Sequence, residues 1–431
     1  MSDSAAPHLR RVLGLWDLVL YGIVLVQPIA PVPLFGIAQQ LSGGFAVTTI
    51  LFAMGAMVLT AISYGRMAAV YPSAGSAYTY VSRSLHPVLG FLTGWAMFLD
   101  YLLVPLICTI YGAVTLQRIV PGVPYAAWVV LFAVLMTGLN LRGIQFTARA
   151  SWVLMVVTTA VISVFIVLAV RFLGADGLVS TVPFYEPGTF KMATVLTATS
   201  VAALTYGGFD GVTTLAEEVE NPRRNVMLAA VGVVLFTGIF GGLQIYLAQL
   251  VWPDYRTFGN LETAFLDVSR RVGGEWMFQS LAVVLIVASF GSGLTAQTGV
   301  ARLLYSMGRA RALPGFFAHL DARTASPVWN VALVGVMACA GALVLNYERS
   351  AELINFGAFL AFMGVNAAVM RLPGLGVLRG KILPGIGFLF CLSIWVNLSK
   401  PALVMGGVWF VAGLVIHLIQ RRRGESFEFT E

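Results

Sequence analysis

The sequence predicts an all-α integral membrane protein with about twelve transmembrane helices. Of its 431 residues, 58% are hydrophobic and only 10% are charged, whereas a soluble chain carries about 25% charged residues. The mean hydropathy of +0.87 agrees with this composition. The 45 glycines and 18 prolines also suit a membrane bundle, because transmembrane helices tolerate both residues. These observations exclude a soluble enzyme, a disordered chain and a nucleic-acid-binding domain.

Apolar runs along the chain define the individual spans, since a transmembrane helix needs about 20 mostly apolar residues. The twelve predicted spans are residues 18–38, 46–68, 88–112, 125–140, 150–173, 192–214, 226–251, 277–301, 328–346, 352–370, 382–398 and 402–419. Two of these runs are short for a full span, namely 125–140 and 382–398. The connecting segments are too short to hold a soluble domain.

The first span is interrupted by Pro28, Pro31 and Pro33. Each proline lacks an N–H donor and clashes with the preceding helical turn, so an uninterrupted helix is excluded here. The sixth span has its own interruption, where Gly207, Gly208 and Gly211 surround an acidic residue. Glycine destabilises a helix by about 1 kcal/mol relative to alanine, which predicts an unwound stretch. Close packing of small residues against a neighbouring helix is the alternative reading.

Two acidic residues fall within predicted spans, Asp100 in the third and Asp210 in the sixth. A carboxylate at membrane depth costs several kcal/mol unless it has a partner or a water-filled cavity. The spans offer no buried lysine or arginine as that partner. Each acid is therefore expected to face a mobile cation or to be protonated for part of a cycle. A neutral, hydrogen-bonded acid without a transport role is the alternative for both.

Lysine and arginine are unevenly distributed among the loops. Most of the 26 basic residues fall in cytoplasmic loops if the N-terminus is cytoplasmic, as the positive-inside rule requires. This bias predicts that both termini are cytoplasmic, and it accounts for the net charge of +7 without a nucleic-acid partner. Short loops and the lack of a targeting extension fit a bacterial inner membrane, and the lipid bilayer is the expected surrounding.

Three stretches resemble signatures of amino acid–polyamine–organocation permeases: Tyr206–Arg224, Ala301–Pro314 and Tyr71–Tyr80. The resemblance covers nearly the whole chain and implies the leucine-transporter fold, with two inverted repeats of five helices and two extra helices. Within the family, the likeness is greatest to bacterial putrescine importers. Four further stretches carry that likeness: Thr60–Gly65, Leu99–Leu102, Leu353–Ala358 and Trp395–Leu398.

Five parts of the chain follow from the two interruptions and this resemblance. They are a cytoplasmic N-terminal tail at 1–15, a first inverted repeat at 16–175, a second inverted repeat at 190–371, two extra helices at 380–420 and a cytoplasmic C-terminal tail at 421–431. In inverted repeats the first and sixth helices are equivalent, so the binding site is expected at the membrane midplane between their interruptions.

The chain departs at two places from amino-acid-transporting members of the resembled family. Their first break is rich in glycine, whereas here no glycine lies between Val26 and Pro33. An α-carboxylate would therefore find few N–H donors. Several proton-coupled members also have a lysine in the fifth helix. Counted from Ala148–Arg149, that position holds Thr158, which leaves a sodium site at Thr158 as an alternative to proton coupling.

We therefore expect a secondary transporter that imports a small cationic amine such as putrescine, coupled to protons, by alternating access around broken helices. An amino acid permease or exchanger for neutral or cationic amino acids is the alternative. The expected substrate-binding residues are Asp210, Asp100, Tyr101, Gln27, Pro28, Ile29, Ala30, Tyr206, Gly207, Gly208 and Phe209. Tyr101 could equally face lipid. The expected coupling-ion residues are Asp210 and Thr158.

Charged residues follow the sixth span at its cytoplasmic end. Glu217, Glu218, Arg223 and Arg224 could form a salt-bridge latch at a cytoplasmic gate. A solvated helix end is the alternative. Neither a channel filter nor a nucleophile–base pair is visible, and the four histidines and three cysteines are scattered. No enzyme activity, cofactor or metal is therefore expected, and the sequence leaves the oligomeric state open.

Overall fold

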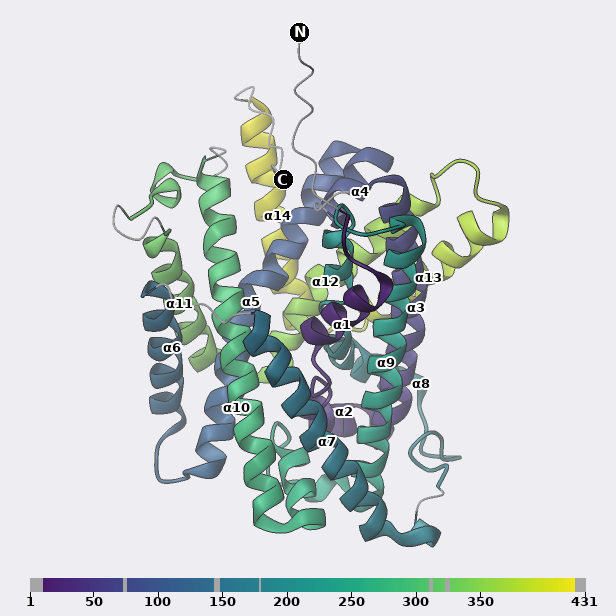
Figure 1. Ribbon diagram of the computed structural model, residues 1–431, viewed down its shortest axis with the longest axis vertical. Coiled ribbons are helices and arrows are strands. Elements are labelled where there is room, and N and C mark those ends of the chain that lie inside the picture. The colour runs from purple at the N-terminus through teal and green to yellow at the C-terminus, as the bar shows by residue number, and fades with distance from the viewer. Residues whose placement is uncertain are drawn as a thin grey trace.

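The computed structural model describes residues 11–72, 76–142, 148–177, 180–309, 313–321 and 326–422. Within these ranges the chain is helical, and the only β pairing is an isolated bridge between Leu13 and Val219. Figure 1 shows a bundle of long helices that run roughly along one direction. The predicted all-α class is confirmed.

Eight helical elements make up the first part of the bundle: α1 (Leu15–Val26), η1 (Val32–Leu34), α2 (Phe35–Ser42), α3 (Ala46–Val70), α4 (Ser76–Ser84), α5 (Pro87–Ile119), α6 (Tyr125–Leu141) and α7 (Ala148–Gly177). The next part contains α8 (Met192–Ala202), η2 (Ala203–Tyr206), η3 (Phe209–Leu215), α9 (Pro222–Val251), η4 (Tyr255–Thr257), α10 (Ala264–Arg309), η5 (Gly315–Ala318), α11 (Val328–Val344) and α12 (Tyr347–Val369). The chain ends with η6 (Leu378–Ile382), α13 (Leu383–Trp395) and α14 (Lys400–Arg422).

Among the described residues, nine helical stretches are long and apolar enough to cross a membrane, and three shorter apolar helices accompany them. Each of these twelve stretches overlaps one of the twelve predicted spans, and the short spans at 125–140 and 382–398 are present as α6 and α13. Helix α4 was not predicted, because it has nine residues and a polar composition. Figure 1 shows the start of the described chain and the end of α14 at the same end of the bundle. We call this the termini end.

Both predicted interruptions are present. Helix α1 ends at Val26, and η1 and α2 continue the span. Between them the chain turns at Gln27, whose φ of +64° is unusual for a non-glycine residue. The sixth span breaks between η2 and η3, where Gly208 has a φ of +99°. Proline and glycine therefore interrupt the two spans as their backbone chemistry requires.

Helix α5 is the central scaffold of the site. It packs against α10 on one side and α12 on another. The α5–α12 contact is so close that a Cβ on Gly357 would clash with the Ala96 carbonyl oxygen. Trp95 stacks on Trp409 of α14 with ring centroids 4.7 Å apart. These contacts fix the helix that carries Asp100.

The chain has one local feature at corresponding places before its third and eighth spans. Helix α4 lies just before α5, and the first part of α10 lies before a kink at Gly274, where φ is +71°. A short helix therefore precedes the third span in one half and the eighth span in the other. This correspondence agrees with repeats at 16–175 and 190–371, which stay a prediction.

Candidate substrate-binding site

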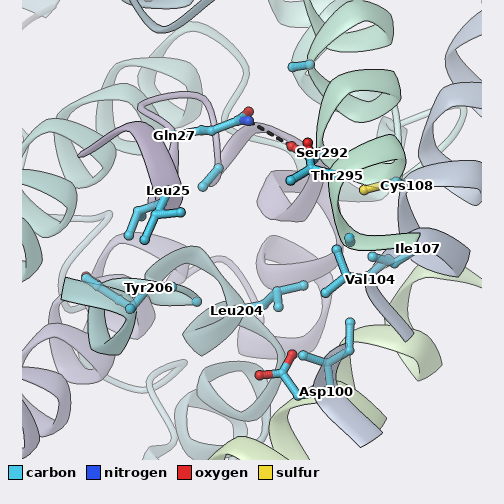
Figure 2. A pocket seen from close by; sticks show the side chains of 18 of the residues that line it. Leu25, Gln27, Asp100, Val104, Ile107, Cys108, Leu204, Tyr206, Ser292 and Thr295 are labelled. Carbon is cyan, nitrogen blue, oxygen red and sulfur yellow. Dashed lines mark hydrogen bonds between the residues drawn. The ribbon is translucent and has the colours of Figure 1, made fainter. Parts of the chain in front are cut away.

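A cavity of about 580 Å³ lies in the middle of the bundle. Its walls come from α1, α5, α7, α10 and α12 and from the breaks in the first and sixth spans. Figure 2 shows the cavity with Gln27 and Ser292 on one side and Asp100 on another. The sequence predicted a binding site between the interruptions of the first and sixth spans. Both interruptions contribute residues to the wall of this one cavity.

Both acids of the predicted spans line this cavity. Asp100 projects from α5 into the space beside Leu204, as Figure 2 shows. Asp210 lies in the first turn of η3, immediately after the glycine break. The positive end of a helix dipole favours a negative charge at that position. Among the described lining residues there is no lysine, arginine or histidine, so two carboxylates face the cavity without a basic partner.

Gln27, the residue of the first break with a positive φ, connects this break to α10. The Gln27 side-chain amide donates a hydrogen bond to the Ser292 hydroxyl at 2.8 Å, drawn as a dashed line in Figure 2. Ile29 and Ala30 also line the cavity. Pro28 does not line it. Its carbonyl oxygen turns toward α9 and accepts a hydrogen bond from the Gln244 amide at 2.9 Å.

Few peptide N–H groups in this break are free. The N–H groups that already donate to backbone carbonyls are those of Gln27, Ala30, Val32 and Leu34. The three prolines have no N–H at all. The structure therefore agrees with the expectation that an α-carboxylate would find few donors here.

The second break contributes Tyr206, Gly207 and Gly208 to the lining. The Tyr206 hydroxyl donates to the Ile50 carbonyl oxygen of α3 at 2.8 Å, which fixes the end of η2. Phe209 is not among the lining residues and is fully buried. Its ring packs against Phe362 with centroids 5.3 Å apart and against Tyr64 with centroids 5.8 Å apart.

Tyr101 lines the cavity, with 46% of its surface exposed. Its lining position is compatible with the predicted role in substrate binding, which stays a prediction. Thr158 is buried outside the lining, and its hydroxyl donates to the Met155 carbonyl oxygen at 2.9 Å. A role for Thr158 in ion coupling stays a prediction.

The structure adds lining residues that sequence reasoning missed. They are Ser289, Ser292 and Thr295 on α10, Asn355 and Tyr347 on α12, and Tyr111 on α5. Isolated hydroxyl residues in an apolar span gave no distinct signal. The run Gly291–Gly293 could have revealed part of this face, because small residues in a span indicate close packing. A Cβ on Gly293 would lie 2.7 Å from the Met136 sulfur.

One end of the cavity lies near an acidic loop residue. The rings of Tyr111 and Tyr347, both lining residues, are 5.4 Å apart. Glu262, in the loop before α10, accepts a hydrogen bond from the Tyr347 backbone N–H at 3.1 Å. Burial raises the pKa of Glu262 above its usual value, and the hydrogen bond from Tyr347 opposes that rise. This end of the cavity also lacks a basic lining residue within the described chain.

The predicted latch residues lie at the termini end. The Glu218 carbonyl oxygen accepts hydrogen bonds from the N–H groups of Val12 and Leu13. Arg223 and Arg224 are exposed. Backbone hydrogen bonds connect this region to the start of α1, and the latch stays a prediction.

These features define the class of the protein. An all-helical membrane bundle with two broken helices around a central acidic cavity is the architecture of a membrane permease. The sequence model of the amino acid permease family matches residues 32–419. The chain therefore belongs to the amino acid permease family, within the amino acid–polyamine–organocation superfamily.

Similar proteins differ in what they carry. The chain is 32% identical to the low-affinity putrescine importer PlaP of Escherichia coli (strain K12), over 96% of both chains. It is 23% identical to the branched-chain amino acid permease BcaP of Bacillus subtilis (strain 168), over 98% of this chain and 95% of that one. It is 27% identical to the vacuolar cationic amino acid transporter 4 of Arabidopsis thaliana, over 85% and 64%.

Proposed function

We propose that this permease imports a small aliphatic amine with two ammonium groups, such as putrescine, by proton-coupled symport. The observation that carries the proposal is the cavity's charge. Asp100 and Asp210 both line it, and no basic side chain lies among its described lining residues. Two carboxylates at membrane depth need cationic partners, and a diamine supplies one ammonium group for each.

The rest of the lining suits the methylene chain of such a substrate. Val104, Ile107 and Leu204 provide apolar surface, and Phe359 and Phe362 add aromatic surface. Aromatic rings also stabilise ammonium groups by about 0.5–2 kcal/mol. Tyr101 follows Asp100 in sequence and lines the same cavity, so an ammonium group at Asp100 would lie near its ring.

The first break argues against a substrate that needs its carboxylate bound. Its prolines have no N–H groups, and most of its remaining N–H groups already donate within the backbone. Similarity to a putrescine importer over 96% of the chain supports the amine. Similarity to a branched-chain amino acid permease makes an amino acid the alternative substrate.

Alternating access would use the two breaks as hinges. Gly208 adopts a backbone conformation that glycine accommodates without a Cβ penalty. The parts of the sixth span on either side, η2 and η3, can therefore reorient with little side-chain obstruction. Asp210 begins η3, so protonation of its carboxyl group would change the charge at the point where the span bends.

Uptake by purified protein in proteoliposomes tests this function. Labelled putrescine is added with and without an inward proton gradient, and unlabelled neutral and cationic amino acids are added as competitors. Saturable, gradient-driven uptake that ignores amino acids is the expected result. Transport of an amino acid in place of putrescine would retain the permease and overturn the amine assignment.

The coupling ion is tested in the same vesicles. We expect a proton gradient to drive uptake and a sodium gradient to have no effect, both in the wild-type protein and in Thr158→Ala. Sodium-driven uptake that is lost in Thr158→Ala would replace the proton with sodium and place its site on α7.

The proposed setting is the plasma membrane of a bacterium, with both termini cytoplasmic. Reporter fusions after α14 and in the segment between α7 and α8 test this orientation, because the two positions should report opposite sides of the membrane. A cytoplasmic signal from the second fusion would reverse the orientation.

A further inference from the structure

A second pocket of about 500 Å³ lies at the end of the bundle opposite the termini end. Its lining consists of Arg118, Trp252, Gly259, Asp267, Arg270 and Arg271. These residues come from the end of α5, the residue after α9, the loop before α10 and the first turns of α10. None of them lines the central cavity.

Positive charge exceeds negative charge in this pocket. Asp267 contacts two of the three arginines, with Arg118 at 2.5 Å and Arg270 at 3.7 Å. Arg270 also contacts Glu275 at 2.9 Å. Arg271 has no carboxylate partner among the residues that the structure describes. One guanidinium group in the pocket therefore lacks a counter-charge.

Aromatic rings hold this unpaired group in place. The Arg271 guanidinium lies 5.4 Å from the centroid of the Trp252 ring and 5.8 Å from that of Phe172. Arginine stacked on aromatic rings keeps its N–H donors available for a planar or tetrahedral oxyanion. The Arg271 guanidinium, in the lining of this pocket, is therefore a fixed positive charge without a carboxylate partner in the described chain.

The pocket lies where lipid headgroups are expected. Trp276 is 56% exposed and Phe172 is 48% exposed, and exposed aromatic residues at helix ends are typical of the membrane–water interface. The kink at Gly274 separates the first part of α10, which holds the three α10 lining residues, from the long apolar part of the helix. Acyl chains could therefore lie along the exposed apolar side chains below the pocket.

We propose that this pocket binds the phosphate of an anionic phospholipid headgroup, with Arg271 as its main ligand. A basic pocket between helix ends is suited to an anionic lipid, and arginine is suited to phosphate. The excess positive charge selects phosphatidylglycerol over a zwitterionic lipid, whose own ammonium group it would repel. In the predicted orientation, this lipid belongs to the outer leaflet. The inference does not depend on the substrate of the central cavity.

Delipidated protein in detergent, examined by native mass spectrometry, tests this lipid site. The probe is dioleoyl phosphatidylglycerol, compared with dioleoyl phosphatidylcholine and with soluble glycerol phosphate. Arg271→Gln removes the unpaired charge, and Arg349→Gln, on an exposed arginine of α12, removes the same charge elsewhere. We expect Arg271→Gln to weaken phosphatidylglycerol binding about tenfold and Arg349→Gln to leave it unchanged.

A second pair of variants keeps all the arginines. A Cβ on Gly259 meets no atom within 4 Å, so a larger side chain is accommodated there. Gly259→Glu adds a carboxylate to the pocket, whereas Gly259→Gln adds a neutral side chain of the same shape. We expect the first to weaken phosphatidylglycerol binding and the second to preserve it.

Three results would overturn this proposal. They are equal binding of phosphatidylglycerol and phosphatidylcholine, equal binding by wild type and Arg271→Gln, and binding of soluble glycerol phosphate as tight as that of the lipid. The last would assign the pocket to a soluble anion. Because the measurement involves no transport, its failure is distinct from a failure of the amine assignment.

Discussion

The first and sixth spans are both interrupted within the bundle, yet the chemistry of the two breaks differs. The first contains three prolines and a glutamine with φ of +64°. Most of its N–H groups are absent or bonded within the backbone. The second contains three glycines and a carboxylate. One break is stiff and has few donors, whereas the other is compliant and carries charge.

This difference separates two tasks that a broken helix can perform. Proline fixes φ, so the first break holds its direction and is anchored to α10 by the Gln27–Ser292 hydrogen bond. Glycine leaves the backbone free to reorient, so the second break can move while Asp210 performs its proposed role as a cation ligand. We infer that the second break supplies recognition and movement, and that the first supplies a fixed wall.

The largest expected effect comes from Asp210→Asn, which removes the charge of the second break. We expect putrescine uptake to fall at least about thirtyfold, because the loss of one partner of a desolvated ion pair costs about 2–5 kcal/mol. Proteoliposome uptake measures it. Glu186→Gln, in an exposed loop, is the matched control and should transport normally. Full uptake by Asp210→Asn would remove Asp210 from the site and leave the second break as a hinge alone.

Asp100 lies on α5, outside both breaks. Asp100→Asn therefore tests whether a carboxylate outside the breaks takes part in substrate recognition. We expect it to weaken putrescine binding about tenfold and butylamine binding less than about threefold. A monoamine needs only one carboxylate, which Asp210 supplies. Inhibition of labelled putrescine uptake by each amine measures the two affinities. Equal losses for both amines would assign Asp100 a structural role.

Gly208→Ala tests whether the second break depends on its glycine conformation. Gly208 has a φ of +99°, whereas Gly207, also in the break, has a φ of −55°. We expect Gly208→Ala to lower the free energy of unfolding by about 1–2 kcal/mol, the cost of a left-handed conformation in a residue with a Cβ. Gly207→Ala should cost less, although its Cβ would lie 3.2 Å from the Leu204 carbonyl oxygen. Apparent thermal midpoints in detergent compare the two, and a larger loss in Gly207→Ala would contradict the argument.

Much of the fold follows from the sequence because span length and the breaking residues are local properties. Twenty apolar residues predict a span, and Pro28 or Gly208 interrupts it, whatever the rest of the chain does. Helix α4 escaped prediction because nine mixed residues carry no hydropathy signal. The kink at Gly274 was not predicted, because the φ of an isolated glycine cannot be inferred from the sequence.

The site was less predictable, because it depends on how each helix is rotated about its axis. Asp100 and Asp210 were identified by the cost of burying a charge, which needs no rotation. Pro28 and Phe209 were expected in the site from their neighbours, yet both face packed helices. Ser292 and Asn355 line the cavity from other spans, and only tertiary packing brings them there.

The last prediction concerns the first break, where the smallest single change removes one hydrogen bond. Gln27 combines a strained φ of +64° with a hydrogen bond to Ser292 at 2.8 Å. Ser292→Ala removes only the hydrogen bond and should cost about 1 kcal/mol. Gln27→Ala loses the same bond and keeps the strain, whereas Gln27→Gly loses the bond and relieves the strain, which is of order 1–3 kcal/mol. We therefore expect Gln27→Gly to have a higher apparent thermal midpoint in detergent than Gln27→Ala. If the two midpoints coincide, the backbone at Gln27 carries no strain and the contrast between a stiff break and a compliant one loses its energetic basis.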